Sequence, residues 1–278
     1  MKIDVAKSAG FCFGVKRALK IALDTAHLGE KVEMLGDIVH NEDVVKQICE
    51  AGVKKIKELR RGVNKILLIC AHGSPNDIYE RATRLGYTIV DATCPMVKEI
   101  HKIVKTLEQE GCEVIIIGDK MHDEVRGIMG HLNGGAVVID NPKKIPVRKI
   151  KRINKACVVV QSTQNLQKTA SIVTILKRHI PDIKFYNTIC KPTRMKQKEI
   201  NSMPLKNDVM LIIGSKKSAN TKRLYQISKS LNKRSYWIQS KDEIKPEWFR
   251  DAKRVGVMSG ASTPDDTTKN VIDYLQSI

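Results

Sequence analysis

The sequence predicts an α/β protein with mainly parallel sheets, because apolar strand-like runs alternate with helical runs along the chain. The strand-like runs include KILLICA (65–71), EVIIIGD (113–119), ACVVVQST (156–163), DVMLIIGS (208–215) and RVGVMSG (254–260). VKRALKIALDTA (15–26) is one of the helical runs between strands. This alternation is typical of parallel sheets covered by helices. A length of 278 residues also predicts two or three units rather than one small core.

A threefold repeat organises these elements. Each copy contains a cysteine, a helix, and an apolar strand that ends in glycine and a polar loop. Cys12, Cys94 and Cys190 each precede that glycine by 24 residues. A second strand with its own polar loop follows in every copy. We therefore expect three similar units, at 1–93 (with the N-terminal strand), 94–189 and 190–278, arranged pseudo-threefold about a centre.

The repeat also predicts a metal site at that centre. Loops at the carboxyl ends of parallel strands line the ligand crevice, so the arrangement brings Cys12, Cys94 and Cys190 to one point. Three thiolates suit zinc or an iron–sulfur cluster. Zinc with a histidine as fourth ligand would be structural, whereas a four-iron cluster on three thiolates leaves one iron open to substrate. The spacing is compatible with either zinc or a cluster. A chain of this size favours the cluster, because it can fold without a structural metal ion.

The strand-end loops supply mostly neutral or cationic hydrogen-bond donors. They hold His40, Asn41, His72, Ser74, His122, Gln161, Ser162, Thr163, Ser218, Asn220, Ser262 and Thr263. Taken singly, such residues are usually solvated or cap a helix. Together they suit a diphosphate, whose oxygens accept several hydrogen bonds. The middle loop also holds Asp123 and Glu124; the spacing does not decide which is a proton donor, and Asp123 can equally cap the next helix.

The other cysteines and the amino terminus indicate a reducing compartment. Seven cysteines at irregular spacing, without CxxC, do not indicate a disulfide framework. Cys49, Cys70, Cys112 and Cys157 lie in helical or strand-like apolar context, so we expect them to pack as small buried side chains. The amino terminus has no apolar signal core, and no stretch approaches the roughly 18 apolar residues of a membrane span. We expect a cytoplasmic chain with no membrane association.

The formal net charge of +19 is spread over the whole chain. Clustered Lys and Arg would favour nucleic acid, but here the basic residues occur on every predicted helix. With four Phe, two Trp and six Tyr there are few rings to stack bases. We interpret the charge as a solvated surface that attracts acidic small molecules or an acidic protein partner, with no nucleic acid.

Together these motifs resemble those of the 4-hydroxy-3-methylbut-2-enyl diphosphate reductases of the non-mevalonate isoprenoid pathway. The resemblance spans the whole chain, and the motifs follow each other in the same order as in that family. The motifs are GFCFGVKRA, GDIVHN, AHG, VDATCPMV, HDEVRG, NTIC, GSKKSANTKRL and GASTPD. The resemblance implies three α/β domains around a [4Fe–4S] cluster with an open iron site. It also implies reductive removal of an allylic hydroxyl, which yields isopentenyl and dimethylallyl diphosphate. Ferredoxin or flavodoxin, both acidic, would suit the basic surface as electron donor.

The resemblance implies roles residue by residue. Cys12, Cys94 and Cys190 match the cluster ligands, and Glu124 rather than Asp123 matches the proton donor. The substrate-binding positions are His40, His72, His122, Ser162, Thr163, Ser218, Asn220 and Ser262, with Ser162 near the substrate hydroxyl. Ser162 replaces a usual threonine and Ala219 a common serine, and ICKPTRMKQ departs from the usual residues after the third cysteine.

Two rival interpretations predict different properties. A nucleic-acid binder with structural zinc would be colourless, with salt-dependent binding to polynucleotides. A redox-sensing cluster protein without catalysis would not need Glu124 or the diphosphate-binding loops.

Overall fold

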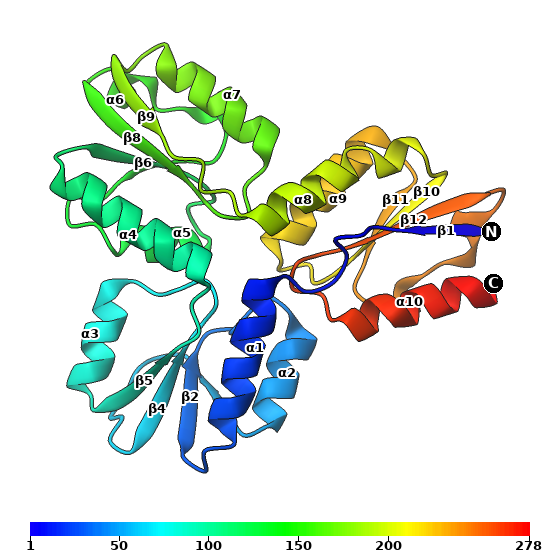
Figure 1. Cartoon of the computed structure of the whole chain (residues 1–278), viewed down its shortest axis with the longest axis horizontal. Helices are drawn as coiled ribbons and strands as arrows, with labels where there is room; N and C mark the ends of the chain where they lie inside the picture. The colour runs from blue at the N-terminus through cyan, green and yellow to red at the C-terminus, as the bar shows by residue number, and fades with distance from the viewer. The chain divides into compact units, whose positions relative to one another are not determined.

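The computed structural model describes residues 1–278 and contains three four-stranded sheets, all parallel (Figure 1). One sheet has the order β3-β2-β4-β5, with β2 at Lys31–Leu35, β3 at Lys54–Ile56, β4 at Lys65–Ile69 and β5 at Tyr87–Asp91. The next has the order β7-β6-β8-β9, with β6 at Glu113–Ile117, β7 at Val137–Ile139, β8 at Lys155–Val160 and β9 at Asp182–Phe185. The third has the order β1-β12-β10-β11, with β1 at Lys2–Val5, β10 at Val209–Ile213, β11 at Ser235–Ile238 and β12 at Arg254–Ser259. The predicted α/β class with three similar parallel units is confirmed.

Helices alternate with these strands. The α-helices are α1 (Phe13–Ala26), α2 (Glu42–Glu50), α3 (Asn76–Arg84), α4 (Pro95–Gln109), α5 (Asp123–Met129), α6 (Val147–Ile150), α7 (Leu166–Lys177), α8 (Lys191–Ile200), α9 (Ala219–Leu231) and α10 (Asp265–Ser277). Short 3₁₀ turns are η1 (Pro142–Lys144), η2 (Met203–Leu205), η3 (Lys241–Glu243) and η4 (Pro246–Phe249). None of the helices combines the length and the apolar character that crossing a bilayer requires.

The sheets are buried on both faces, which explains their continuous apolar runs. In β6, Ile115 and Ile117 pack with α7 residues on one face. Their neighbours Val114 and Ile116 pack with α4 and α5 on the opposite face. Because successive side chains of a strand point to opposite faces, a run such as EVIII supplies apolar residues to two cores.

The chain divides into two compact units. The first consists of residues 1–16, 39–46 and 191–278 and holds the β1-β12-β10-β11 sheet. The second consists of residues 17–38 and 47–190 and holds the other two sheets. The boundaries expected near residues 94 and 190 stay predictions.

The amino-terminal strand differs from the sequence prediction, which placed it with the first repeat. β1 instead pairs with β12, from Lys2 opposite Arg254 to Val5 opposite Val257. The partner lies some 250 residues away, and the local sequence KIDV carries no signal that selects it. The amino terminus is therefore built into the same unit as the carboxyl-terminal strands.

The cysteines outside the repeat depart from the expected packing in two ways. Cys112 and Cys157 are buried as predicted, but they form a disulfide with each other, which the expectation of two separately packed cysteines missed. Cys157 lies opposite Val114 in the β6–β8 register, and Cys112 lies two residues before Val114 on the same face. This register brings the two Cα atoms to 5.9 Å. Cys49 is exposed on α2, where packing was expected.

Replacing Cys112 and Cys157 together by alanine is expected to lower the free energy of unfolding by about 3 kcal/mol, because the bridge restricts the unfolded chain. The two residues are 45 positions apart. Urea unfolding followed by circular dichroism measures the loss. Cys49→Ala, at an exposed thiol, is the control and is expected to match the parent. A double variant as stable as the parent would contradict a structural bridge.

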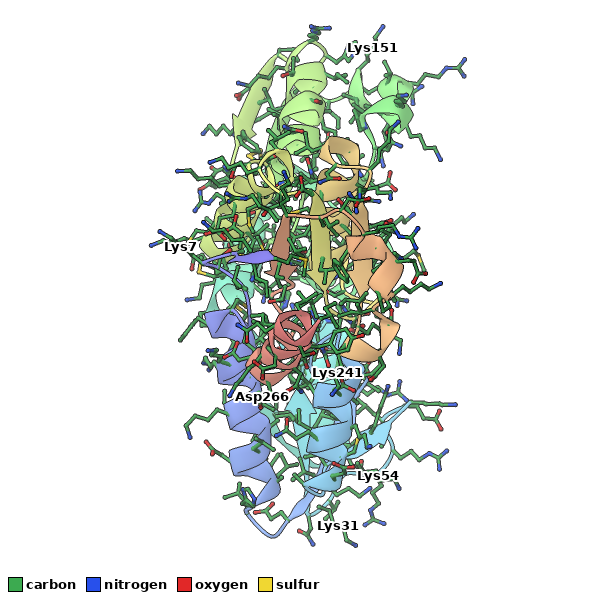
Figure 2. The ribbon with its side chains drawn as sticks, turned by 90° about the vertical axis from the view of Figure 1, so that its right-hand side faces the viewer. Lys7, Lys31, Lys54, Lys151, Lys241 and Asp266 are labelled. Atoms are coloured by element: carbon green, nitrogen blue, oxygen red, sulfur yellow. A yellow bond between two sulfur atoms is a disulfide. The ribbon has the colours of Figure 1, made fainter.

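The basic residues are distributed as the sequence indicated. Figure 2 labels the exposed lysines Lys7, Lys31, Lys54, Lys151 and Lys241, which come from segments of all three sheet-and-helix regions. Because no single element gathers them, the charge of +19 acts as a general field rather than as one polynucleotide groove.

Candidate active site

The three repeat cysteines occupy equivalent positions, each at the start of a helix. Cys12 precedes α1, Cys94 is the N-cap of α4, and Cys190 precedes α8. None of the three forms a disulfide, and all three have partly exposed side chains. The positive end of a helix dipole stabilises negative charge at such positions.

The backbone fixes each of these cysteines in the same way. The amides of Cys12, Cys94 and Cys190 donate 3.0 Å hydrogen bonds to the carbonyls of Ala261, Ala71 and Ser162, respectively. Each acceptor lies two residues beyond the end of a central strand, namely β12, β4 and β8. The repeat read from the sequence is thus matched, cysteine by cysteine, in the hydrogen bonds of the fold. The backbone amide of each cysteine is therefore hydrogen-bonded to the loop that follows a central strand, β12 for Cys12, β4 for Cys94 and β8 for Cys190.

The two remaining thiols lack these features. Cys49 lies near the end of α2, in exposed surroundings. Cys70 follows β4, and its sulfur donates to the carbonyl oxygen of Gly73 at 3.3 Å. Burial raises the pKa of the Cys70 thiol to about 12, so it stays protonated and is a poor metal ligand.

A buried carboxylate is bonded directly to one of these loops. Glu124, in the first turn of α5, is 1% exposed. Its Oε1 accepts from the Ser162 amide at 2.5 Å, and its Oε2 accepts from the Ser162 hydroxyl at 2.9 Å. The carbonyl of Ser162 in turn holds the amide of Cys190. A buried carboxylate, a hydroxyl and a cysteine are therefore linked through Ser162.

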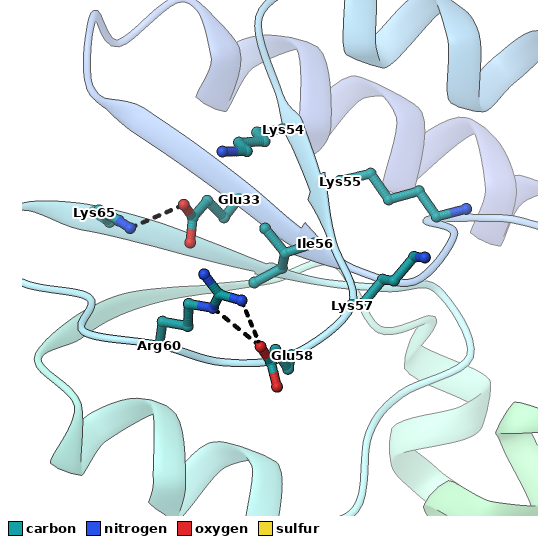
Figure 3. Close-up of a pocket in the computed structure, with 8 residues that line it drawn as sticks. All are labelled: Glu33, Lys54, Lys55, Ile56, Lys57, Glu58, Arg60 and Lys65. Carbon is teal, nitrogen blue, oxygen red and sulfur yellow. Dashed lines mark hydrogen bonds and ion pairs between the residues drawn. The ribbon is translucent and has the colours of Figure 1, made fainter.

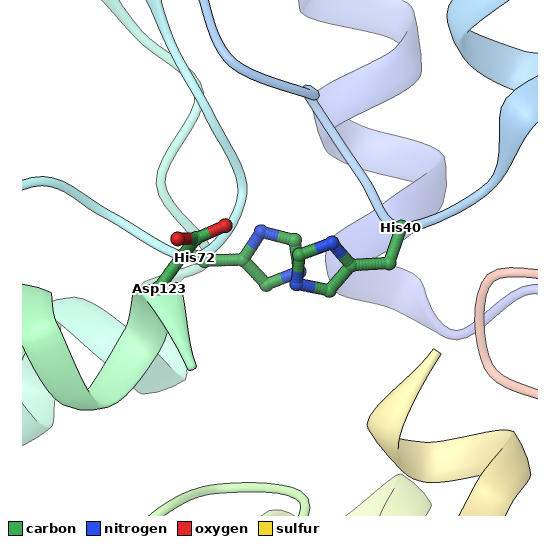
Figure 4. A group of neighbouring side chains, drawn as sticks. All are labelled: His40, His72 and Asp123. Carbon is green, nitrogen blue, oxygen red and sulfur yellow. The ribbon is translucent and has the colours of Figure 1, made fainter. Parts of the chain in front are cut away.

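His122 is bonded to the backbone of Glu124, and His72 packs against His122. His122 is the N-cap of α5, and its Nδ1 accepts from the Glu124 amide at 3.1 Å. A neutral His122 ring therefore carries its proton on Nε2, from which it can donate. The rings of His122 and His72 meet edge to face with centroids 5.6 Å apart. His72 follows β4 and Asp123 begins α5, and their ligating atoms lie within 4.8 Å (Figure 4). Asp123 is exposed, whereas Glu124 is buried.

The compact unit of residues 1–16, 39–46 and 191–278 carries four of the predicted binding residues. His40, labelled in Figure 4, lies just before α2. Its carbonyl accepts from the Ser262 hydroxyl at 3.3 Å. Ser218 is the N-cap of α9 and accepts from the Thr221 amide at 3.3 Å. Asn220 lies in the first turn of that helix, 5% exposed. Ser218 thus has the capping role that single loop serines usually have, and this role leaves its hydroxyl proton available to a ligand.

Thr163 was predicted from the sequence, whereas the contacts of Arg17 and Lys196 were not. Thr163 accepts from the Gln161 side chain at 3.2 Å. Arg17 of α1 donates to the carbonyl of Thr93 at 3.1 Å, next to Cys94. Lys196 of α8 is 2% exposed, although its helix is basic and looks solvated in the sequence. Neither basic residue carries a sequence signal, because both stand among many exposed lysines and arginines.

His101 supports the loop that carries His72. It lies on α4, 6% exposed, and a Cβ on Gly73 would approach its Cε1 to 2.6 Å. Gly73 has φ of +76°, so glycine suits both its backbone and its contact with the ring. The His131 ring lies 4.0 Å away between centroids.

The folded protein is expected to lose stability below neutral pH through His101. Burial lowers the pKa of His101 from 6.5 to about 3. The charges of His131, Lys105 and Lys98 lower it further, whereas the negative charge of Asp91 opposes this shift. In the unfolded chain the His101 ring is protonated below about pH 6.5, whereas in the folded chain it is protonated only below about pH 3. The free energy of unfolding therefore falls as pH drops through that window, by about 1.4 kcal/mol per unit.

Urea unfolding between pH 7 and pH 4 measures this slope. His101→Gln is expected to flatten it, whereas His27→Gln, at an exposed histidine after α1, is the control. An unchanged slope in His101→Gln would assign the acid sensitivity to other groups.

A pocket of about 630 Å³ beside the edge strand β3 is a different feature (Figure 3). It is lined by Glu33, Lys54, Lys55, Ile56, Lys57, Glu58, Arg60 and Lys65. Lys65 pairs with Glu33 at 2.9 Å, and Arg60 pairs with Glu58 at 2.7 Å. Lysines on an edge strand also oppose pairing with a foreign sheet. The basic lining is therefore explained without a ligand.

Comparisons with known proteins agree with this geometry. The model of the LytB protein family matches residues 3–276. A 4-hydroxy-3-methylbut-2-enyl diphosphate reductase of Aquifex aeolicus is 39% identical over 99% of this chain and 96% of the relative, and one of Geotalea uraniireducens is 36% identical over 100% and 98%. A solved (E)-4-hydroxy-3-methyl-but-2-enyl diphosphate reductase superposes with a TM-score of 0.73 at 38% identity over all of both chains. The E-1-hydroxy-2-methyl-but-2-enyl-4-diphosphate reductase of Plasmodium falciparum superposes with a TM-score of 0.91 at 27% identity, over 99% of this chain and 88% of the other. The chain therefore belongs to the LytB protein family and is an oxidoreductase.

Proposed function

We propose that the chain removes the allylic hydroxyl of 4-hydroxy-3-methylbut-2-enyl diphosphate reductively, and that it forms isopentenyl and dimethylallyl diphosphate. The observation that carries this proposal is the link from Glu124 through Ser162 to Cys190. It joins a buried proton donor to a thiol at the start of a helix, as removal of a hydroxyl as water requires. The relatives named above supply the substrate class.

We propose that Cys12, Cys94 and Cys190 together hold a [4Fe–4S] cluster, which three thiolates of this kind fit. None of the three sulfurs forms a disulfide, all three residues are partly exposed and placed at helix starts, and the three backbones are anchored in one repeated way. Soft thiolates select iron–sulfur clusters or zinc, and a redox reaction favours the cluster. When bound through only three thiolates, such a cluster supplies electrons and one iron that acts as a Lewis acid.

The chain's own residues bind the substrate and deliver the proton. His40, His72, His122, Ser218, Asn220 and Ser262 donate to the diphosphate, and Thr163 lies with them. Ser162 faces the substrate hydroxyl, and its own hydroxyl already donates to Glu124. When Glu124 is protonated, its carboxyl O–H donates to the Ser162 oxygen, and the Ser162 hydroxyl donates its own proton to the leaving oxygen of the substrate, so one proton passes from Glu124 through Ser162. The burial of Glu124 keeps competing water away from this path.

The proposal is tested by turnover with product analysis. Anaerobically purified protein, a low-potential reductant and the allylic diphosphate are expected to yield both five-carbon diphosphates. Gas chromatography after phosphatase treatment resolves isopentenol from dimethylallyl alcohol. Consumption of the reductant without either product would overturn the proposed reaction.

We also infer that the electron donor is a small acidic protein such as a ferredoxin or flavodoxin. The charge of +19 favours encounter with such a partner, and salt screens this attraction. Turnover with the protein donor is expected to fall steeply between low and high ionic strength, while substrate affinity falls less. The same titration with a small chemical reductant is the control. Donor-driven turnover that is insensitive to salt would contradict this role of the charge.

A further inference from the structure

The loop between β1 and α1, residues 8–12, ends at Cys12 and is fastened by a buried lysine. Lys196 lies on α8, and its side chain is among the largest fully buried ones. Its ammonium donates to the carbonyls of Ser8, Gly10 and Ser259, the last two at 3.1 Å and 3.0 Å. An ammonium has three protons, so these carbonyls satisfy it completely. The lysine thus ties the loop before Cys12 to the end of β12.

Other contacts in the same unit complete the clamp. Glu199, one turn after Lys196, accepts from the amide and hydroxyl of Ser8 at 3.1 Å and 2.8 Å. The Gly10 amide donates to the Ser259 hydroxyl at 2.5 Å. The Cys12 amide donates to the Ala261 carbonyl. Lys196 is the member that bridges two loop carbonyls and the strand end at once.

The opposite side of the loop is also fixed. Gly10 has φ of +88°, and a Cβ there would lie 2.2 Å from Asp265 Oδ1. The same oxygen accepts from the Phe11 amide at 3.3 Å. The loop therefore lies between α10 and α8 without room for a side chain at Gly10.

A buried lysine is a costly choice for a purely structural anchor, because removing an ammonium from water requires full hydrogen-bond compensation. Burial lowers the pKa of Lys196 from 10.5 to about 8, and the negative charge of a Cys12 thiolate is the main opposing influence. The ammonium lies 3.1 Å from the carbonyl oxygen of Gly10, two residues before Cys12, so its positive charge lies close to this cysteine along the loop. A methionine would fill the same space at lower cost but would supply neither the charge nor the three hydrogen bonds.

We propose that Lys196 is a positioning residue for Cys12: it fixes the loop that carries this thiol and places a buried positive charge beside it. The inference rests on the proposed function in so far as Cys12 is a cluster ligand. A positive charge near a cluster favours its reduced, more negative form, so Lys196 also raises the reduction potential. Helix α8 begins directly after Cys190, and through Lys196 it also holds the loop that carries Cys12.

Hydrogen exchange of the full chain tests the clamp independently of any cluster. In the Cys94→Ser background, which is expected to be free of cluster, Lys196→Met is expected to speed exchange of the amides of residues 10–12 by about tenfold or more. Lys196→Arg, which keeps charge and donors, is expected to restore most of the protection. Lys198→Met, at an exposed lysine of the same helix, is the control and is expected to match its background.

The charge is tested in the anaerobic holoenzyme by an electron paramagnetic resonance titration of the cluster potential. Lys196→Gln, which keeps donor hydrogens without the charge, is expected to shift the potential to more negative values, and Lys198→Met is expected to leave it unchanged. A Lys196→Met chain with parental exchange in residues 10–12 would overturn the clamp. A Lys196→Gln cluster with the parental potential would overturn the effect of the charge. Iron retained by Cys94→Ser would instead refute the proposed ligand set, and the exchange comparison is unaffected by that failure.

Discussion

Replacing Cys94 by serine is expected to abolish the cluster and to reduce turnover to background. Serine keeps the size of the side chain and the N-cap of α4, but its hydroxyl is a hard and weakly acidic ligand where iron prefers thiolate. The backbone bond to Ala71 does not depend on the side chain, so the fold is expected to persist. Iron content, visible absorption and turnover are measured together with a circular dichroism spectrum.

Cys49→Ser is the matched control, since that thiol is free and exposed. It is expected to keep both iron and activity. The same loss as in Cys94→Ser is expected for serine at Cys12 and Cys190. An active, iron-loaded Cys94→Ser protein would refute the assignment of the three ligands.

Glu124→Gln is expected to lower turnover by roughly 10²-fold or more, the usual scale for a lost general acid. The amide has nearly the same shape, and its oxygen still accepts from the Ser162 amide, so the loop that holds Cys190 is expected to stay in place. What is lost is the transferable proton. Cluster content and substrate affinity are therefore expected to stay near parental values while the rate constant falls.

Asp123→Asn, in the same turn of α5, is the control for this variant. Asp123 is exposed and was the competing candidate for the proton donor. It is expected to change the rate far less than Glu124→Gln does. Parental turnover in Glu124→Gln would mean that the proton comes from another source, such as the diphosphate itself.

The sequence predicts most of the fold because its strands are buried on both faces. Runs such as EVIII and VMLII appear as β6 and β10 at the expected places. The spacing of the three cysteines also predicts their equivalence, which the amide bonds to Ala261, Ala71 and Ser162 display. Hydrophobic pattern and repeat spacing are local properties, so one sequence is enough to read them.

Features that depend on distant partners could not be predicted from the sequence. The pairing of β1 with β12 and the bridge between Cys112 and Cys157 follow from strand order and register, which a local pattern does not specify. Lys196 sits in a basic helix whose other lysines are exposed or partly exposed, so its burial becomes visible only in the packed fold. The bond between Glu124 and Ser162 likewise joins the start of α5 to a loop 38 residues further along the chain.

The central claim, that three cysteines hold a catalytic iron–sulfur cluster, is tested most directly by metal and sulfide analysis of the anaerobically purified chain. The account predicts a brown protein with about four iron and four acid-labile sulfide per chain, and an electron paramagnetic resonance signal after reduction that changes when the allylic diphosphate is added. A colourless protein that contains zinc but neither iron nor sulfide would contradict it and would support a structural zinc site instead.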